Sequence, residues 1–484
     1  MADDRELDRM LEEELTAVPP PGDQLTEITP WRRAIARLIG GSAMVLFAMT
    51  PLGYLMNVAG VLLMMLGFRM LRRENRWFTA GWLLSMANMA LMLVYLAWPA
   101  TAYWTLEEMT VVNLSASAIL LGQFFCLWRG IRAVRRASGR TDQAGSAGLL
   151  FFSCLLGTAV SLSGLRGLLP GLAIAALLIF ALFQLGKVGR LMDGVGYAVK
   201  MAPVRTPEWA VWLVWLVCCA LCVPLAGAIG AHYPMDWTPR EPIEHTALEA
   251  IRTDLLDLGM PPYVLEDLTV EEIRALKEAV RMEVSVDTQP FNEGREFRGA
   301  NFRRTVYDVR EMLFTSVAIE MPDGHWRVIH HFVWQNRPEI RGGTDYILLS
   351  TPYNRNEEDW LPVGEPTASG RLLYDRDGVT YVGDFYELGI REYAIYSMFE
   401  DPQPARSPYA AFTFPKEGER FRGYLIYETE PLESAWILDS WIYYTHQDRP
   451  FNYPFVTAKM SHEDGWNSRY YQTRGDAVQV LLDE

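Results

Sequence analysis

Residues 31–76 read WRRAIARLIGGSAMVLFAMTPLGYLMNVAGVLLMMLGFRMLRRENR, in which an uncharged apolar run, Leu38–Phe68, is enclosed by two arginine clusters. Pro51 and Gly53 lie near the middle of this run, where such a pair either kinks one long helix or turns a hairpin. The 31 residues are too many for one upright helix across a ~30 Å hydrocarbon core, which needs about 20. If the run is a hairpin, both arginine clusters lie on the same side of a membrane.

Five more uncharged apolar runs follow the first one. They are Trp77–Trp98, Val111–Trp128, Ala147–Leu165, Leu168–Gly186 and Trp209–Ala231. Because lipid offers no hydrogen-bond partners to the backbone, such runs cross a membrane as helices. With the hairpin, the sequence predicts an α-helical transmembrane bundle of about seven spans, whose first two form a short hairpin.

The distribution of basic residues decides between the hairpin and the single span. With the hairpin and a cytoplasmic N-terminus, 16 Lys and Arg flank the inner ends of the spans and only Arg166 lies outside. Membrane insertion produces this bias, whereas a single first span would mix the two sides. Arg outnumbers Lys 39 to 5, which we attribute to a GC-rich bacterial genome. The predicted location is therefore the inner or plasma membrane of a bacterial cell, with an extracytoplasmic C-terminal half.

The two halves of the chain differ in charge and polarity. Residues 1–231 are apolar with a net charge of +4, and residues 232–484 are polar with a net charge of −19. The acidic half would repel phosphate groups, which argues against a nucleic-acid partner, while the apolar half implies the lipid bilayer as a partner. We divide the chain into a cytoplasmic tail and spacer (1–30), a transmembrane helical domain (31–231) and an extracytoplasmic β-rich domain (232–484).

The N-terminal tail has the pattern of an acidic amphipathic helix. Its apolar face consists of Leu7, Met10, Leu11 and Leu15. The proline-rich residues 19–22 then end the helix and form a stiff spacer. An anionic inner leaflet repels such a helix, but a groove on a basic protein accommodates it. We predict that this face binds a cytoplasmic protein, and a solvated tail or one that docks on the protein itself is the alternative.

From residue 282 onward the apolar positions alternate with polar ones, which is typical of strands. About ten strand-like runs are separated by turn signals such as Pro322–Gly324 and Asp375–Gly378. Before them, Ile243–Leu258 has helical spacing, and Thr269–Glu272 is a capping box that opens a helix to about Arg281. The predicted fold is a mostly antiparallel β-sandwich or curved sheet with two short helices.

Metal-binding and catalytic signatures are absent from the sequence. His325 and His331 are six residues apart, about 20 Å along a strand, so they do not share one ion. The H-E-x-x-H, G-x-S-x-G and P-loop patterns do not occur. The predicted spans contain no ionisable carboxylate or amine, which argues against a pump. We predict no metal site and no cofactor, and we expect that the protein is not an enzyme.

Residues on two predicted strands are the candidate ligand-binding residues. Alternation puts Trp441 and Tyr443 on one face of their strand, which suits contact with a glycan or a peptide, and burial of both faces is the alternative. On the strand of residues 326–334, Arg327 and His331 share one face. His330 lies on the opposite, largely apolar face, so we expect a hydrogen-bonded core histidine there.

These features favour a non-enzymatic, multi-pass membrane protein whose exterior β domain binds an envelope protein or glycan. The helical bundle would anchor this domain and relay its state to the N-terminal tail. Two alternatives stay open. The first is a scaffold or accessory subunit of an envelope assembly or export complex, and the second is an envelope hydrolase that uses exterior carboxylates.

Overall fold

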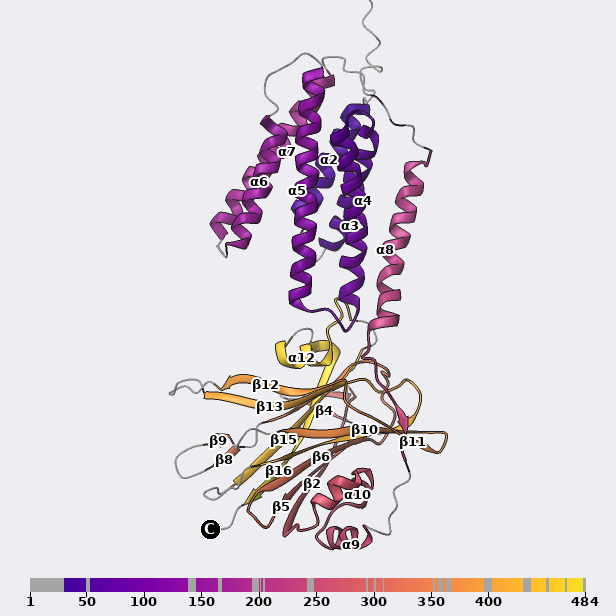
Figure 1. Cartoon of the computed structure of the whole chain (residues 1–484), viewed down its shortest axis with the longest axis vertical. Helices are drawn as coiled ribbons and strands as arrows, with labels where there is room; N and C mark the ends of the chain where they lie inside the picture. The colour runs from indigo at the N-terminus through magenta and orange to yellow at the C-terminus, as the bar shows by residue number, and fades with distance from the viewer. Residues whose placement is uncertain are drawn as a thin grey trace, which may run out of the picture. The chain divides into compact units, whose positions relative to one another are not determined.

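The computed structural model of the chain describes residues 30–48, 53–137, 145–163, 168–193, 200, 202, 205–241, 248–292, 295–299, 302–307, 309–350, 353–355, 360–362, 367–395, 403–429, 437–449, 452–465 and 468–481. The chain divides into two compact units, Met1–Trp98 with Trp104–Pro224, and Pro99–Tyr103 with Leu225–Glu484. The first unit is helical and the second is rich in strands (Figure 1). The predicted tail face of Leu7, Met10, Leu11 and Leu15 lies outside the described residues.

The helical part of the chain contains seven described α-helices between residues 30 and 230. They are α2 (Pro30–Leu46), α3 (Gly53–Leu71), α4 (Arg76–Ala97), α5 (Leu106–Ala137), α6 (Gly145–Leu162), α7 (Leu168–Asp193) and α8 (Glu208–Gly230). Among the described residues, five stretches are long and apolar enough to cross a membrane: Gly53–Leu71, Arg76–Ala100, Glu108–Ala137, Leu169–Val188 and Glu208–Gly230. The apolar stretch of α6 is shorter, Gly148–Val160.

The first apolar run forms two helices rather than one. α2 and α3 pack antiparallel, since Gly41 lies against Gly60 while Leu38 lies against Gly67. A Cβ atom at Gly41 would be 2.6 Å from the carbonyl oxygen of Gly60, so the two backbones touch with no side chain between them. This arrangement agrees with the hairpin and not with one long kinked helix. The turn at Pro51 lies outside the described residues.

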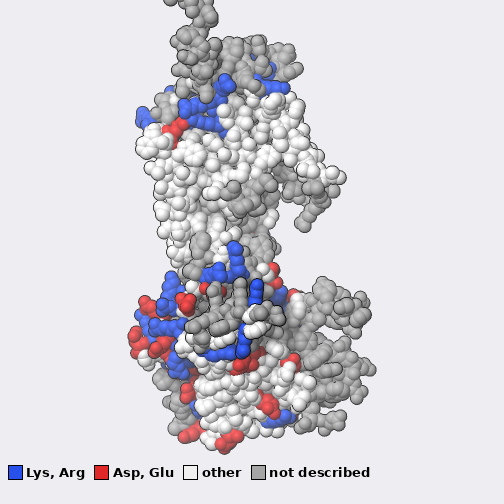
Figure 2. Space-filling model, turned by 180° about the vertical axis from the view of Figure 1, so that it is seen from behind, with Lys and Arg blue, Asp and Glu red and all other residues white. Residues whose placement is uncertain are grey.

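Charged side chains of the helical unit gather at one end in the face drawn in Figure 2, and the flanks of the helices show almost none. Arg37 of α2 donates to the carboxylate of Glu208 of α8 at 2.7 Å. The guanidinium groups of Arg76 and Arg129 lie 5.2 and 5.1 Å from the ring centroid of Trp77. Basic side chains around an aromatic ring are typical of the boundary between lipid and water.

We predict that Gly41→Ala destabilises the helical unit while Gly40→Ala does not. A methyl group at Gly41 would collide with the backbone of α3, whereas at Gly40 its nearest neighbour would be a Leu63 side-chain atom 4.0 Å away. Overpacking of this kind costs about 1–3 kcal/mol. Thermal unfolding of the detergent-solubilised protein measures the difference. Equal melting temperatures for the two variants would contradict the close contact between α2 and α3.

The first large sheet of the β domain has seven described strands in the order β1-β11-β10-β14-β6-β5-β2. Their bounds are β1 (Thr238–Pro239), β2 (Arg281–Gln289), β5 (Met312–Glu320), β6 (Trp326–Trp334), β10 (Ala368–Arg376), β11 (Val379–Gly383) and β14 (Glu419–Glu428). β5 and β6, and β10 and β11, are joined by the two predicted hairpin turns, where Gly324 and Gly378 have φ of 82° and 77°. Glycine adopts this left-handed conformation without steric cost.

The second large sheet has the strand order β12-β13-β7-β15-β8-β9, and β16 pairs with β15 on its other side. Its strands are β7 (Asp345–Leu349), β8 (Tyr353–Arg355), β9 (Trp360–Pro362), β12 (Glu387–Ile395), β13 (Gln403–Phe412), β15 (Ile437–Gln447) and β16 (Tyr471–Leu481). A separate hairpin consists of β3 (Arg295–Arg298) and β4 (Arg303–Val306). Every described strand pair is antiparallel, as predicted.

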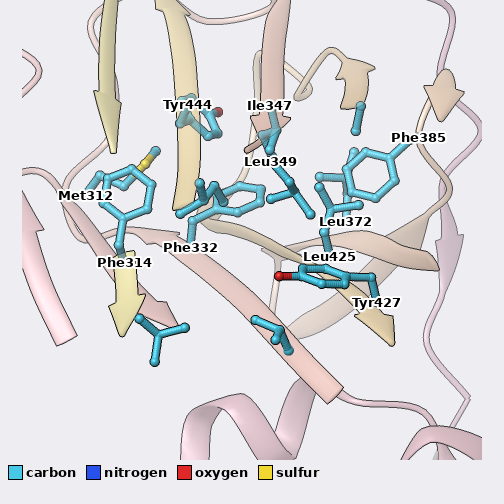
Figure 3. Packing of buried hydrophobic residues seen from close by; sticks show 14 of the residues in the cluster. Met312, Phe314, Phe332, Ile347, Leu349, Leu372, Phe385, Leu425, Tyr427 and Tyr444 are labelled. Atoms are coloured by element: carbon cyan, nitrogen blue, oxygen red, sulfur yellow. The ribbon is translucent and has the colours of Figure 1, made fainter. Parts of the chain in front are cut away.

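The main core of the β domain lies between these two sheets. Phe332 and Leu425 from the first sheet meet Ile347 and Tyr444 from the second, and all four side chains are fully buried (Figure 3). Burial of each large apolar side chain contributes roughly 1.5–3 kcal/mol. The two sheets are therefore held together mainly by this aromatic and aliphatic contact, which is the arrangement of a sandwich.

Short helices cover the outer face of the first sheet. They are α9 (Glu249–Asp257), α10 (Pro262–Asp267) and α11 (Val270–Ala275), and a fourth helix, α12 (Ala458–Asp464), packs against the second sheet. The predicted capping box is present, because Thr269 and Glu272 cap each other at the start of α11. The predicted helix to Arg281 is too long, since α11 ends at Ala275 and Arg281 already pairs with Glu320 in the sheet.

Candidate functional site

The four residues predicted to bind a ligand lie on two different sheets. Arg327 and His331 belong to β6 of the first sheet, and Trp441 and Tyr443 belong to β15 of the second. Arg327 and His331 contact the short helices, whereas Trp441 and Tyr443 lie on the face of their sheet that points away from the core. The structure does not bring the two pairs together.

His331 lies in a buried ion-pair network beneath α10. It is only 1% exposed, and its Nε2 is 2.9 Å from a carboxylate oxygen of Asp267. Arg422 of β14 donates to the same oxygen at 3.0 Å. Burial would raise the pKa of Asp267, but hydrogen bonds and charges from His331 and Arg422 outweigh burial and lower this pKa. His331 therefore joins α10 to the sheet, instead of facing an exterior ligand as predicted.

Arg327 holds another helix against the same sheet. Its guanidinium donates to the backbone carbonyl of Ala275, the last residue of α11, at 2.7 Å. The guanidinium also lies 3.2 Å from a carboxylate oxygen of Glu428. A cation at the carboxyl end of a helix satisfies carbonyl groups that have no partner within the helix. These contacts give Arg327 a structural role at the junction of α11 and the first sheet.

His330 is a core histidine, as predicted. Its Nδ1 lies 2.8 Å from the Ser316 hydroxyl on the neighbouring strand, and its Nε2 lies 2.7 Å from the Ser440 hydroxyl on β15. The imidazole therefore bridges the two sheets through the core. Burial lowers the pKa of His330 to about 3, so the ring is neutral at physiological pH.

Trp441 and Tyr443 form an aromatic pair on the outer face of the second sheet. Their rings are stacked, with centroids 6.1 Å apart and planes 10° apart. Tyr443 is half-buried and its ring lies 6.2 Å from that of His462 in α12. Trp441 is 37% exposed and is the more accessible member of the pair.

Trp441 lines a groove of about 560 Å³ between β2 and β16. The other lining residues come from β2 and from positions 475–479 of β16. Glu283, Asp287 and Asp476 contribute three carboxylates, and no Lys or Arg is among the described residues that line the groove. The groove is therefore acidic and has an aromatic ring at its side.

Asp476 connects the groove to the core. Its carboxylate accepts a hydrogen bond from the Ser316 hydroxyl at 3.2 Å and lies 3.4 Å from the Ser285 hydroxyl. Burial raises the pKa of Asp476, although these hydrogen bonds oppose the shift. Because Ser316 also contacts His330, a continuous hydrogen-bonded path joins the groove to the centre of the sandwich.

Both strands beside the groove are edge strands. Among the described strands, β2 pairs only with β5, and β16 pairs only with β15. Each one therefore presents a row of backbone N–H and C=O groups that no neighbouring strand satisfies. Val284 and Val286 of β2 are also exposed. An exposed apolar edge of this kind is a template to which another extended chain adds.

The groove does not have the arrangement of a metal site. In the part of the chain that the structure describes, no group of three or more His, Cys, Asp or Glu side chains is placed to hold a metal ion. Glu283 pairs with Arg281 at 2.9 Å, and the carboxylates of Glu283, Asp287 and Asp476 do not form one chelating set.

Comparison with known proteins assigns no family. No protein-family model matches the chain, and no curated protein matches it. Among solved structures, the chain is similar to one described as a pore-forming protein, with 8% sequence identity, 42% of this chain and 90% of that chain covered, and a TM-score of 0.16. This score is too low to support a shared fold or function. The architecture itself defines the class: apolar helices followed by antiparallel β sheets.

Residue alternation predicted the outward-facing Trp441 but not the groove beside it. Strand β2 was predicted, yet Ser285 and Asp476 on the two walls are 191 residues apart in the chain. Alternation shows which residues of a strand share a face but not which strand lies next to it. The acidic positions of β2 were therefore indistinguishable from an ordinary solvated face.

We predict that the protein loses stability as the pH falls from 6.5 toward 3, the window set by His330. In the unfolded chain this histidine takes up a proton below about pH 6.5, whereas in the fold it stays neutral, so protonation favours unfolding by about 1.4 kcal/mol per pH unit. His462, whose pKa burial lowers to about 4, adds to the slope. Denaturant unfolding of the full-length protein at several pH values measures how the free energy of unfolding depends on pH. If this dependence is the same in His330→Asn as in the wild type, His330 is not its source.

Proposed function

We propose that this chain is a non-enzymatic, multi-pass protein of a bacterial cell membrane whose β domain binds an extended basic peptide segment of an envelope partner. The observation that carries the proposal is the acidic groove between the edge strands β2 and β16, with Trp441 at its side. An exposed tryptophan also suits a glycan, and the experiment below distinguishes a glycan from a peptide.

The backbone of the two edge strands supports a peptide as the ligand. An extended segment that adds to β2 or β16 satisfies the backbone groups that lack a strand partner. Val284 and Val286 on the exposed face of β2 offer apolar contacts to alternate side chains of such a segment. A glycan would use the aromatic ring but would leave the edge of the sheet unpaired.

The charge of the groove supports a basic ligand. Glu283 and Asp287 of β2 line it, and the half of the chain that contains the β domain has a net charge of −19. A field of this sign raises the rate at which basic segments arrive and disfavours acidic ones. The exposed face of Trp441 adds a cation–π contact for a Lys or Arg side chain.

We predict that Trp441→Ala and the double variant Glu283→Gln with Asp287→Asn each weaken binding of a peptide of alternating Lys and Val about ten-fold. Fluorescence anisotropy of the labelled peptide, with the full-length protein in nanodiscs, measures the affinity. Glu417→Gln is the matched control, because this exposed carboxylate pairs with Arg376 and does not line the groove.

Two results would overturn the peptide proposal. One is equal binding of an alternating Glu and Val peptide, and the other is wild-type affinity in both groove variants. Saturable binding of an oligosaccharide that only Trp441→Ala abolishes would replace the peptide by a glycan. Rising salt is expected to weaken peptide binding and to leave glycan binding unchanged, because exposed charges are screened.

For the membrane part we propose seven spans, a cytoplasmic N-terminus and an extracytoplasmic β domain. The distribution of basic residues, the five candidate spans among the described residues and the antiparallel packing of α2 and α3 support this arrangement. We also propose that the tail face of Leu7, Met10, Leu11 and Leu15 binds a cytoplasmic protein and reports the occupancy of the groove to it. Its amphipathic pattern is the support for this step.

We predict that alkaline phosphatase fused after Glu484 is active and that green fluorescent protein fused there stays dark. Alkaline phosphatase folds only outside the cytoplasm. Green fluorescent protein that is exported in an unfolded state does not become fluorescent outside the cytoplasm. Protease added to intact spheroplasts is expected to degrade the β domain. A fluorescent fusion that survives this protease would contradict the proposed orientation.

A further inference from the structure

The β domain contains a second pocket, of about 270 Å³, that is separate from the groove. Its lining includes Phe291, Glu311, Trp334, Glu339, His446 and Asp448. We propose that this pocket binds the ammonium group of a small primary amine, such as a lysine side chain. The inference rests on a buried histidine with an open nitrogen, on the charge of the lining and on two aromatic rings.

In its neutral form, His446 supplies a hydrogen-bond acceptor. It is 7% exposed, and its Nδ1 lies 2.6 Å from a carboxylate oxygen of Asp345. His446 lines the pocket and Asp345 does not. No described group hydrogen-bonds to Nε2. A neutral imidazole that donates from Nδ1 has a lone pair at Nε2, and an ammonium group is a donor that satisfies it.

Neighbouring side chains hold this histidine in one orientation. The ring of Trp334 packs against the imidazole with centroids 4.8 Å apart. The indole N–H of Trp334 in turn donates to the hydroxyl of Tyr444 at 3.3 Å. With Asp345 on one side and Trp334 on the other, the acceptor is ordered before a ligand arrives, which lowers the entropic cost of binding.

Three carboxylates give the pocket a negative charge. One oxygen of Glu311 accepts the backbone N–H of Phe291 at 2.8 Å, which leaves the other oxygen for a ligand. Glu339 and Asp448 have no ion-pair partner among the described residues, and no described Lys or Arg lines the pocket. The described residues contain no set of metal ligands, so an ammonium group, whose N–H donors reach separate acceptors, fits this charge better than a metal ion.

The aromatic wall and the volume define the size of the ligand. The rings of Phe291 and Trp334, which both line the pocket, have centroids 5.0 Å apart and planes 52° apart. The guanidinium of Arg474 lies 5.9 Å from the centroid of the Phe291 ring. Aromatic faces attract cations and also pack against methylene groups. The pocket lies just below the roughly 300–1,000 Å³ of sites for drug-sized ligands, so a single alkyl ammonium chain matches it.

Calorimetric titration of the full-length protein in detergent, with N-acetyl-lysine methylamide as the probe, tests the proposal. We expect saturable binding, and binding of the uncharged analogue N-acetyl-norleucine methylamide that is at least ten-fold weaker. Glu311→Gln keeps an oxygen for the Phe291 N–H but removes the charge, so it is expected to weaken lysine binding at least ten-fold without unfolding the domain. His446→Phe is expected to do the same, because a phenyl ring has no nitrogen lone pair to accept a hydrogen bond.

Two control variants separate this site from the groove. Trp441→Ala and Glu283→Gln line the groove and not the pocket, so the lysine probe is expected to bind them as it binds the wild type. Absence of saturable binding, equal affinity for the norleucine probe, or wild-type affinity in a folded Glu311→Gln protein would overturn the amine site. Loss of binding in the groove variants alone would assign the amine to the groove.

Discussion

A chain of buried hydrogen bonds through the sandwich sets the position of one sheet relative to the other. It runs from Asp476 on β16 through Ser316 on β5 and His330 on β6 to Ser440 on β15. A buried polar group without a partner costs free energy, so only a register that satisfies all four groups is stable. The apolar contacts around them supply most of the attraction but tolerate small shifts.

This constraint also shapes the two candidate sites. Because Asp476 reaches across to β5, the edge strands β16 and β2 lie side by side and form the acidic groove. Along β15, Ser440 and His446 point to the core side, while Trp441 points outward, as alternation requires. One strand therefore contributes to the core, to the exposed aromatic pair and to the amine pocket.

Local patterns predicted a large part of this domain. The turn glycines, the capping box at Thr269 and the core position of His330 follow from rules that act over a few residues, and all three are present. The predictions failed where such patterns are weak or are overridden. Helix α10 has only six residues, too few for a helical period, and β12 does not alternate strictly, since the charged residues Arg391 and Glu392 are adjacent. Helix α11 ends at Ala275 and is shorter than predicted, and Arg281 pairs with Glu320 in the first sheet.

By itself, the sequence determined the apolar helical half, the antiparallel strands of the acidic half and the histidine in its core, because period, turn chemistry and charge bias are local properties. Only the tertiary structure decided that His331 is sequestered by Asp267, 64 residues away, and that Trp441 borders a groove whose walls are 191 residues apart. The physical reason is that the packing of side chains and the hydrogen bonding of buried polar groups, over the whole domain, decide what lies against a strand's face or edge. No short stretch of the chain contains that information.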